Sequence, residues 1–287
     1  MDVNAQLTDQ QRVELAGLEY QPLGVGDHVR LSNGKRVGRV KRAFYKQDGL
    51  RGTIIVNHHQ DHKEITVLFR GSSGLRHGNP TTWSNEWLAT NLPIGRSIVE
   101  HRVGEIPSQL KSAAVLLNQL MQQDLNTHYY IYGHSLGAIN AQYALANCAH
   151  PECLNEAWLY EGPNVYWLLD DQQKAQAAVL RNKINNYIDS LDIVTLGYTD
   201  LHHAIGRIRY VQSILLDPIS QHMWGGYQFD QNGKLYTKPV AEYREKIDRE
   251  LIEHVSQASS SWHQWRQEQA KKRQELNRWL PYRSFAS

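Results

Sequence analysis

The stretch from position 129 to 147, YYIYGHSLGAINAQYALAN, constrains the fold more than any other part of the chain. Its first four residues are aromatic or β-branched, which predicts a buried strand. After GHSLG, apolar residues recur at helical spacing, at Leu136, Ile139, Tyr143 and Ala146. A G-x-S-x-G sequence between a strand and a helix is typical of a nucleophile elbow. We therefore predict that Ser135 is a catalytic nucleophile; the alternative is a buried serine in a glycine-rich turn.

The two glycines of this motif have a physical reason in such a turn. Gly133 and Gly137 would lie where the backbones of the strand and the helix come too close for a Cβ atom. The turn would present the Ser135 hydroxyl at the carboxyl end of the sheet, above the N-terminus of the helix. Because the helix dipole is positive there, negative charge that develops near the serine would be stabilised.

Length and composition allow a sizeable globular core and give no sign of a nucleic-acid-binding protein. With 287 residues and 41% hydrophobic content, the chain can form one large α/β domain, alone or with an appendage. The net charge of +2 gives no electrostatic reason to expect a nucleic-acid partner. Cys148 and Cys153 are too few for a disulfide framework, and we expect free thiols rather than one small bridge.

The N-terminal sequence, MDVNAQLTDQQRVELAG, lacks the basic start and apolar centre of an ordinary secretory signal. No stretch of the chain approaches the roughly 20 apolar residues of a membrane span. We therefore expect a soluble protein with no transmembrane segment, either cytoplasmic or exported without a cleaved signal peptide.

Local patterns predict the order of the secondary-structure elements. Thr8, with Gln11 at the capping-box position, should begin a helix that runs through Leu18. Residues 28–45 alternate around an Asn-Gly turn at 33–34, which predicts a β-hairpin at the start of the domain. Further patterns predict strands at 53–56, 64–69, 156–160, 184–188 and 208–216, and helices at 108–122 and 170–180. This alternation favours an α/β fold with a mostly parallel central sheet and helices on both faces.

The loop between the strands at 53–56 and 64–69 has the sequence NHHQDHK. His58, His59, Asp61 and His62 could bind a metal ion by composition. A hydrated hairpin tip is the better interpretation, because the run matches no familiar spacing of zinc ligands. We therefore predict neither a metal site nor a cofactor.

A second motif lies upstream of the elbow, where the strand ending at Phe69 opens into the sequence RGSSG. Hydrolases with a nucleophile elbow place their second oxyanion donor in a loop of this kind. FRGSSG, the segment WSNEWLATNLP and GHSLG occur in an order that resembles the class 3 lipase group of α/β-hydrolases over roughly residues 40–225. The resemblance implies an α/β-hydrolase fold, with the oxyanion held by Ser72 and by the backbone N–H of Leu136.

The same resemblance places a lid directly after the RGSS loop, at residues 75–93. Trp83 and Trp87 would be one helical turn apart there, with Leu88 beside them. A surface helix buried against the domain fits this segment equally well.

A nucleophilic serine needs a histidine to take its proton and a carboxylate to orient that histidine. In α/β-hydrolases these residues follow in the order serine, acid, histidine. Asp192 begins an Asp-x-Val sequence that matches the class 3 group, and Asp189 is the alternative. His222 follows a predicted strand, in a loop of the kind that carries the histidine in that group; the pair His202 and His203 is the alternative.

The C-terminal part of the chain carries a different pattern. An Asn-Gly turn at 232–233 predicts a last hairpin, so we place the hydrolase-like domain at 1–238 and a helical segment at 239–287. This segment could pack on the domain, bind a protein partner as a coiled-coil arm over 239–280, or lie on a membrane surface. Some bacterial lipase-type effectors join such a domain to a helical targeting segment, which is an analogy only.

These observations predict a serine hydrolase that cleaves fatty acyl esters of lipids through an acyl-enzyme, as a lipase or a phospholipase A. Nothing in the motifs recognises the alcohol or the chain length, so a soluble carboxylesterase or thioesterase is the enzymatic alternative. A helical interaction protein with an inactive hydrolase domain is the alternative from another class.

Overall fold

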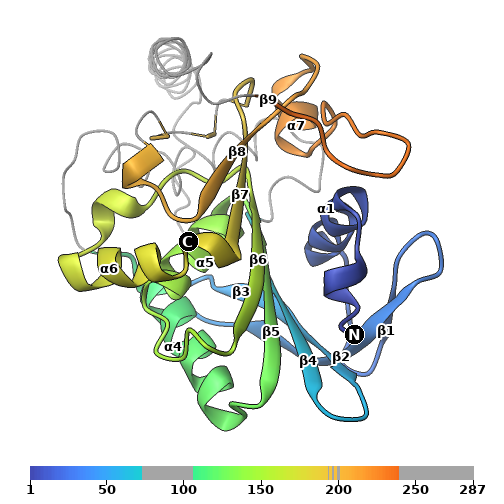
Figure 1. The fold of residues 1–287 in the computed structure, drawn as a ribbon, viewed down its shortest axis with the longest axis vertical. Helices are drawn as coiled ribbons and strands as arrows, with labels where there is room; N and C mark the ends of the chain where they lie inside the picture. The colour runs from blue at the N-terminus through green and yellow to red at the C-terminus, as the bar shows by residue number, and fades with distance from the viewer. Residues whose placement is uncertain (73–105, 193, 196, 199–200, 239–287) are drawn as a thin grey trace, which may run out of the picture.

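The computed structural model of the chain describes residues 1–72, 106–192, 194–195, 197–198 and 201–238 (Figure 1). These residues form a nine-stranded sheet in which the strands follow one another in chain order. The strands are β1 (His28–Arg30), β2 (Arg36–Tyr45), β3 (Arg51–His58), β4 (Lys63–Phe69), β5 (Thr127–His134), β6 (Leu154–Tyr160), β7 (Ile184–Asp189), β8 (Arg207–Val211) and β9 (Thr237–Lys238). The predicted lid at 75–93 and the predicted helical segment at 239–287 lie outside the described residues.

The sheet has an antiparallel part and a parallel part. Strands β1 to β4 pair antiparallel as successive hairpins, and the first of these is the predicted hairpin at the start of the domain. Strands β4 to β8 pair parallel, and the short β9 closes the sheet antiparallel to β8. Parallel neighbours require crossover connections, and these contain helices between β4 and β5, between β5 and β6, and between β6 and β7. The parallel part agrees with the prediction and contains the β5–α5 unit; the chain has the α/β-hydrolase fold.

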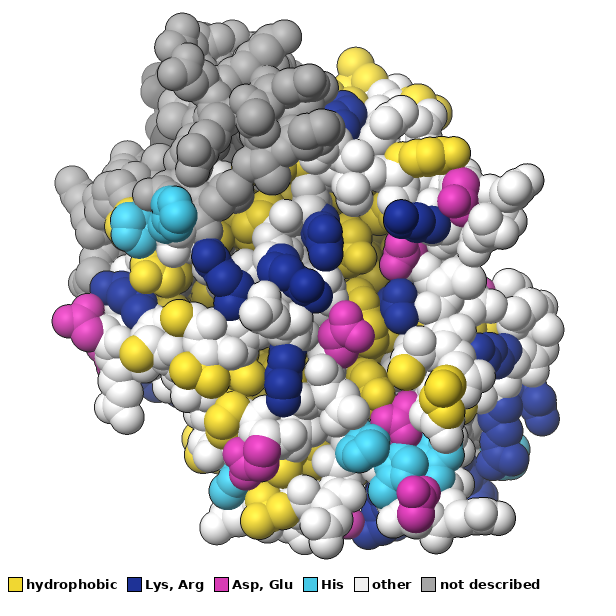
Figure 2. All heavy atoms as spheres, viewed as in Figure 1, with side chains coloured by type: hydrophobic (Ala, Val, Ile, Leu, Met, Phe, Trp, Pro, Cys, Tyr) yellow, Lys and Arg dark blue, Asp and Glu magenta, His cyan; other side chains and the backbone are white. Residues whose placement is uncertain are grey.

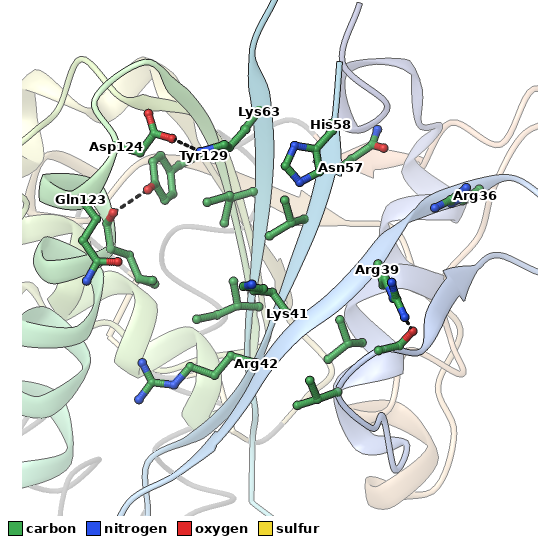
Figure 3. Close-up of a pocket in the computed structure, with 17 residues that line it drawn as sticks. Arg36, Arg39, Lys41, Arg42, Asn57, His58, Lys63, Gln123, Asp124 and Tyr129 are labelled. Atoms are coloured by element: carbon green, nitrogen blue, oxygen red, sulfur yellow. Dashed lines mark hydrogen bonds and ion pairs between the residues drawn. The ribbon is translucent and has the colours of Figure 1, made fainter. Parts of the chain in front are cut away.

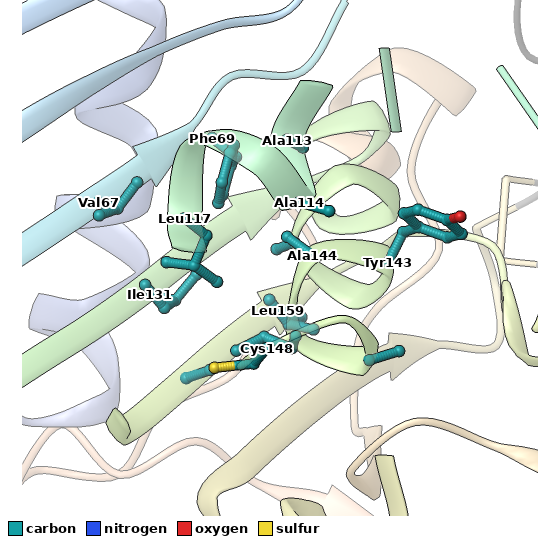
Figure 4. Packing of buried hydrophobic residues seen from close by; sticks show 14 of the residues in the cluster. Val67, Phe69, Ala113, Ala114, Leu117, Ile131, Tyr143, Ala144, Cys148 and Leu159 are labelled. Carbon is teal, nitrogen blue, oxygen red and sulfur yellow. The ribbon is translucent and has the colours of Figure 1, made fainter. Parts of the chain in front are cut away.

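Helices cover both faces of the sheet (Figure 1). On one face lie α4 (Ser108–Gln123), α5 (Leu136–Ala146) and α6 (Asp171–Val179); α1 (Asp9–Gly17) lies on the other. Every residue of α5 is buried, because α5 packs against β4, β5 and β6 of the sheet and against α4 and α6. Figure 4 shows Leu117 of α4 beside Phe69 of β4 and Ile131 of β5. The elbow helix is therefore held on all sides by the main hydrophobic core.

The N-terminal segment is anchored to the second face by buried polar contacts. The Asn4 amide donates to Glu64 Oε1 and to Thr66 Oγ1, at 2.7 and 2.8 Å. Tyr132 in β5 donates its hydroxyl to Asn4 Oδ1 at 2.8 Å. The capping box predicted for Thr8 is present in α1, which confirms that helix start. This segment is thus part of the folded domain.

Other sequence predictions meet different outcomes. Cys148 and Cys153 are free and buried, as expected. The strand predicted at 208–216 ends at Val211. Beyond it, the backbone of residues 212–214 forms hydrogen bonds with residues 226 and 236 and an isolated bridge with Tyr227. The Ser213 hydroxyl donates to Asp189. The last hairpin is reduced to an isolated bridge between Phe229 and Leu235. No helix in the described ranges is long and apolar enough to cross a membrane.

Candidate active site

The GHSLG sequence forms a strained turn between β5 and α5. Ser135 has φ 55° and ψ −125°, a backbone conformation that residues with a side chain rarely adopt. A Cβ atom on Gly133 would lie 2.5 Å from the Gly137 carbonyl oxygen, and one on Gly137 would lie 2.0 Å from the Phe69 carbonyl oxygen. The turn therefore exists only because both flanking residues are glycine, and it has the backbone geometry of a nucleophile elbow.

This packing predicts a large effect for Gly137→Ala. The added methyl group would push α5 away from β4, and we expect a loss of stability of about 3 kcal/mol or more. In a domain of this size that corresponds to a fall in Tm of roughly 10 °C, which differential scanning calorimetry would measure. Gly17→Ala is the matched control: Gly17 has helical φ and ψ, and its added Cβ would meet the Trp224 ring at an ordinary 3.7 Å. That control should be neutral or slightly stabilising; equal losses in both variants would contradict the steric account.

Asp192 and His222 are in contact. His222 ends the short helix α7 (Pro218–His222), and its Nδ1 lies 2.6 Å from Asp192 Oδ2, with both side chains fully buried. The other oxygen, Asp192 Oδ1, accepts a hydrogen bond from the Val194 amide at 3.0 Å. Because an ionised carboxylate only accepts, His222 donates through Nδ1–H, and its Nε2 is left as an acceptor. That Nε2 has no hydrogen-bond partner among the described residues.

His134, the residue before Ser135, brings His222 to the elbow. Its Nε2 donates to the His222 carbonyl oxygen at 2.8 Å, and the two rings lie 4.7 Å apart between centroids. Burial lowers the pKa of His134 well below its ordinary value, so this ring is neutral. Since the ring proton is on Nε2, Nδ1 is a hydrogen-bond acceptor, and the Tyr20 hydroxyl donates to it at 2.5 Å. The N-terminal segment therefore positions the elbow through Tyr20.

Asp189, the alternative acid, and His203, one of the alternative histidines, have other contacts. Asp189 Oδ1 accepts from Ser213 Oγ at 2.6 Å, and Oδ2 accepts from Gln221 Nε2 at 2.5 Å. Asp189 thus bonds to the segment before α7 and to α7 itself, whereas the His222 ring bonds to Asp192. His203 lies near the rings of Tyr166 and Trp167, with centroid distances of 5.3 and 5.0 Å.

Sequence reasoning did not identify Glu161, which lies beside the two aspartates. It directly follows β6, has a positive φ of 52°, and is fully buried. Its carboxylate accepts hydrogen bonds from the Asp189 amide, at 2.9 Å, and from the Tyr227 hydroxyl. Burial raises its pKa well above the ordinary range, and the nearby Asp192 and Asp189 raise it further. Its position at a parallel strand end was the only available signal. Glu161 links the turn after β7 to Tyr227 and so supports the Asp192 segment.

The RGSS loop lies against the elbow. A Cβ atom on Gly71 would be 2.9 Å from the His134 carbonyl oxygen and 3.3 Å from Ser135 Cβ, so Ser72 follows within one residue of that contact. The Gly71 amide donates to Glu19 Oε1 at 3.0 Å, which ties this loop to the N-terminal segment. Leu136 begins α5, where backbone N–H groups lack an acceptor within the helix. Both predicted oxyanion donors are therefore close to Ser135 in the chain or in space.

A cavity of about 1270 Å³ lies away from these residues (Figure 3). It is lined by the antiparallel strands and the end of α4, and includes Arg39, Lys41, Arg42 and the ion pair between Lys63 and Asp124. Ser135, Asp192 and His222 do not line it. The candidate active site is therefore at the carboxyl ends of the parallel strands and not in this cavity.

The chain matches no protein-family model and no curated protein. Solved structures are similar to it. A variant of MDLA from Penicillium cyclopium is 16% identical, with 84% of this chain and 86% of that chain covered and a TM-score of 0.46. The Rhizomucor miehei lipase in complex with its propeptide is 14% identical, with coverages of 71% and 67% and a TM-score of 0.46. A triacylglycerol lipase from Penicillium expansum is 14% identical, with coverages of 74% and 81% and a TM-score of 0.43.

Proposed function

We propose that the protein is a serine hydrolase that cleaves fatty acyl esters of lipids through an acyl-enzyme. The observation that carries this proposal is a buried aspartate–histidine pair whose histidine is bonded to His134, the residue before the strained elbow serine. Among the described residues, His222 Nε2 has no hydrogen-bond partner and so can accept a proton. Such an arrangement is what acyl transfer to a serine hydroxyl requires.

In this mechanism His222 Nε2 takes the proton of Ser135 Oγ as the oxygen attacks the ester carbonyl. Asp192 fixes the tautomer of His222 and stabilises the imidazolium that forms. The oxyanion is held by the Leu136 amide and by Ser72, through its amide and its hydroxyl, with each donor contributing about 3–4 kcal/mol in the transition state. His222 then protonates the leaving alcohol. A water molecule, activated by the same imidazole, releases the carboxylic acid and restores Ser135.

Exposed aliphatic side chains near α7 support a lipid substrate. Ile214 and Leu215 lie between β8 and α7 and are 51% and 74% exposed. Leu191, next to Asp192, is 38% exposed. Aliphatic side chains that reach solvent beside a candidate catalytic histidine suit contact with acyl chains or an aggregated lipid. A soluble carboxylesterase or thioesterase would use the same reacting groups without that contact.

The test is hydrolysis of p-nitrophenyl butyrate and palmitate by the full chain, each with and without detergent micelles. The proposal expects the higher rate on palmitate and an increase when substrate aggregates. A higher rate on butyrate that does not change when micelles form would indicate a soluble esterase and not a lipase. A wild type inert on every acyl ester, phospholipid vesicles included, would favour the interaction protein with an inactive hydrolase domain.

The oxyanion role of Ser72 gives a separate prediction. Ser72 is half-buried at the end of the RGSS loop, so Ser72→Ala should leave the fold intact. If its hydroxyl holds the oxyanion, kcat should fall by about 10²–10³-fold with little change in KM. Steady-state kinetics on p-nitrophenyl butyrate and a thermal melt measure the two effects. An unchanged kcat would remove the hydroxyl from this role and leave only the Ser72 amide.

A further inference from the structure

Five ionisable side chains meet at the opposite end of the sheet, where the N-terminus, the β3–β4 turn and the start of β5 come together. We call them the histidine cluster: Asp2, His59, His62, Glu64 and His128. Figure 2 shows this group of histidines with acidic side chains beside it, at the lower right. His59 and His62 lie at the predicted hairpin tip but are partly buried, whereas His58 is exposed.

Asp2 is the centre of the cluster. His62 Nε2 lies 2.5 Å from Asp2 Oδ1, and His128 Nδ1 lies 2.7 Å from Asp2 Oδ2. One potential ligand atom from each of these three residues lies within 4.8 Å of the other two. A third imidazole nitrogen, His59 Nε2, lies 3.8 Å from Asp2 Oδ1. The side chains of Asp2 and His62 are only 7% and 13% exposed, so the groups converge on a partly shielded point.

The protons of His62 are the decisive detail. Its Nδ1 lies 2.7 Å from Asp61 Oδ1 while its Nε2 faces Asp2 Oδ1, and an ionised carboxylate can only accept. A neutral imidazole has one N–H, so it cannot satisfy both contacts. Either His62 is an imidazolium, or a cation replaces the proton on Nε2. A histidine that donates one N–H to a carboxylate while its other nitrogen faces a second ligand is the usual outer arrangement of a metal-bound histidine.

The remaining contacts orient the same group. The Tyr130 hydroxyl donates to Asp2 Oδ2 at 2.7 Å and so fixes the carboxylate. Burial raises the pKa of Asp2, but hydrogen bonds from Tyr130, His62 and His128 outweigh it and bring the pKa to about 2. Glu64 is already satisfied by the Val3 and Asn4 amides, at 2.9 and 2.7 Å. Apart from Tyr130, Asp2 is bonded to the two histidines that a cation would also use, so Asp2 is the carboxylate of the candidate ligand set.

We propose that Asp2, His62 and His128 bind a divalent transition-metal ion, with zinc as the first candidate. Two imidazoles and one carboxylate are a ligand set that zinc accepts, and His59 is the nearest further imidazole. His128 is the second residue of β5 and His134 is the last, so the site is roughly 20 Å from the elbow. The ion would tie the N-terminus to the β3–β4 turn and stabilise the fold without entering the ester chemistry.

The groups that face His62 are Asp2, Asp61, His59 and His128. Zinc binds a deprotonated imidazole nitrogen, so its binding should strengthen as pH rises.

The experiment uses the full chain, stripped with a chelator and titrated with zinc chloride by calorimetry and thermal melting at about pH 6 and pH 8. We expect one equivalent of zinc to bind, a rise in Tm of several degrees, and a larger rise at pH 8. His62→Ala and His128→Ala should weaken binding about 100-fold or more, and His128 is 42% exposed, so its variant should fold. His58→Ala, an exposed histidine at the end of β3, is the matched control and should bind as the wild type.

Ester hydrolysis measured at 25 °C with and without zinc should be equal, which separates this proposal from the proposed function. Absence of zinc uptake by the stripped wild type would overturn the proposal. So would uptake that survives both His62→Ala and His128→Ala. In either case the cluster would be an imidazolium network that pins the N-terminus by hydrogen bonds alone.

Discussion

Ser135→Ala is expected to lower kcat for ester hydrolysis by a factor of about 10⁴–10⁶ while the protein stays folded. Alanine keeps the Cβ atom and meets the same backbone strain at φ 55°, so the variant removes only the hydroxyl. Steady-state hydrolysis of p-nitrophenyl butyrate measures the rate, and a thermal melt should give a Tm close to that of the wild type. A rate within tenfold of the wild type would mean that Ser135 is not the nucleophile.

The double variant Ser135→Ala/His222→Ala is the matched test of cooperation between the two residues. Residues that act as one unit lose nearly all activity when either is removed, so the double variant should be about as slow as Ser135→Ala alone. Losses that multiply would show that His222 acts independently of the serine, and would point to a different proton acceptor.

Asp192→Asn is expected to lower kcat by about 10⁴-fold. The carboxylate accepts from His222 Nδ1 at 2.6 Å, whereas an asparagine amide in the same place can donate to that nitrogen. The proton would then move to Nε2, and His222 could no longer take the proton of Ser135. Kinetics at saturating p-nitrophenyl butyrate, corrected for the folded fraction, measure the loss.

Asp189→Asn separates the two candidate acids. Its carboxylate accepts from Ser213 and Gln221, so the substitution places an amide against these donors and should cost stability. Activity per folded molecule should fall far less than in Asp192→Asn. The reverse order of the two kinetic losses would assign the acid to Asp189.

The elbow could be predicted from the sequence because every residue that defines it is contiguous. The strand, the motif and the helix of 129–147 follow local rules of side-chain alternation and glycine placement, and the structure has β5 and α5 where those rules put them. The start of α1 is predictable for the same reason, since Thr8 and Gln11 bond to each other's backbone. The parallel order of β4 to β8 follows from the alternation of strands with helices.

Contacts between distant segments could not be predicted in this way. Chain order allowed His202, His203 and His222 alike, and only the fold, with α7 capped by Asp217, places His222 against Asp192. The histidine cluster escaped the sequence because its carboxylate, Asp2, and its third imidazole, His128, come from segments far from the NHHQDHK loop. Familiar zinc motifs have closely spaced ligands within one segment, so ligands from three distant segments leave no recognisable spacing in the sequence.

The N-terminal segment has two structural roles that could not be predicted from its sequence. Near the elbow, Tyr20 donates to His134 and Glu19 accepts from the Gly71 amide, so this segment supports both the serine turn and the RGSS loop. At the other end of the sheet, Asp2 gathers the histidine cluster. A single segment thus holds the two ends of β5 against the rest of the domain.

The most direct test of the account is covalent labelling of the full chain with an alkyl p-nitrophenyl phosphonate, followed by mass spectrometry of intact protein and peptides. A serine activated by a histidine attacks the phosphorus and expels p-nitrophenol, which leaves one phosphonyl group on the protein. The account predicts a single adduct on Ser135, absent from Ser135→Ala and formed far more slowly by Asp192→Asn. A single adduct on another residue, or none on folded wild-type protein, would contradict it.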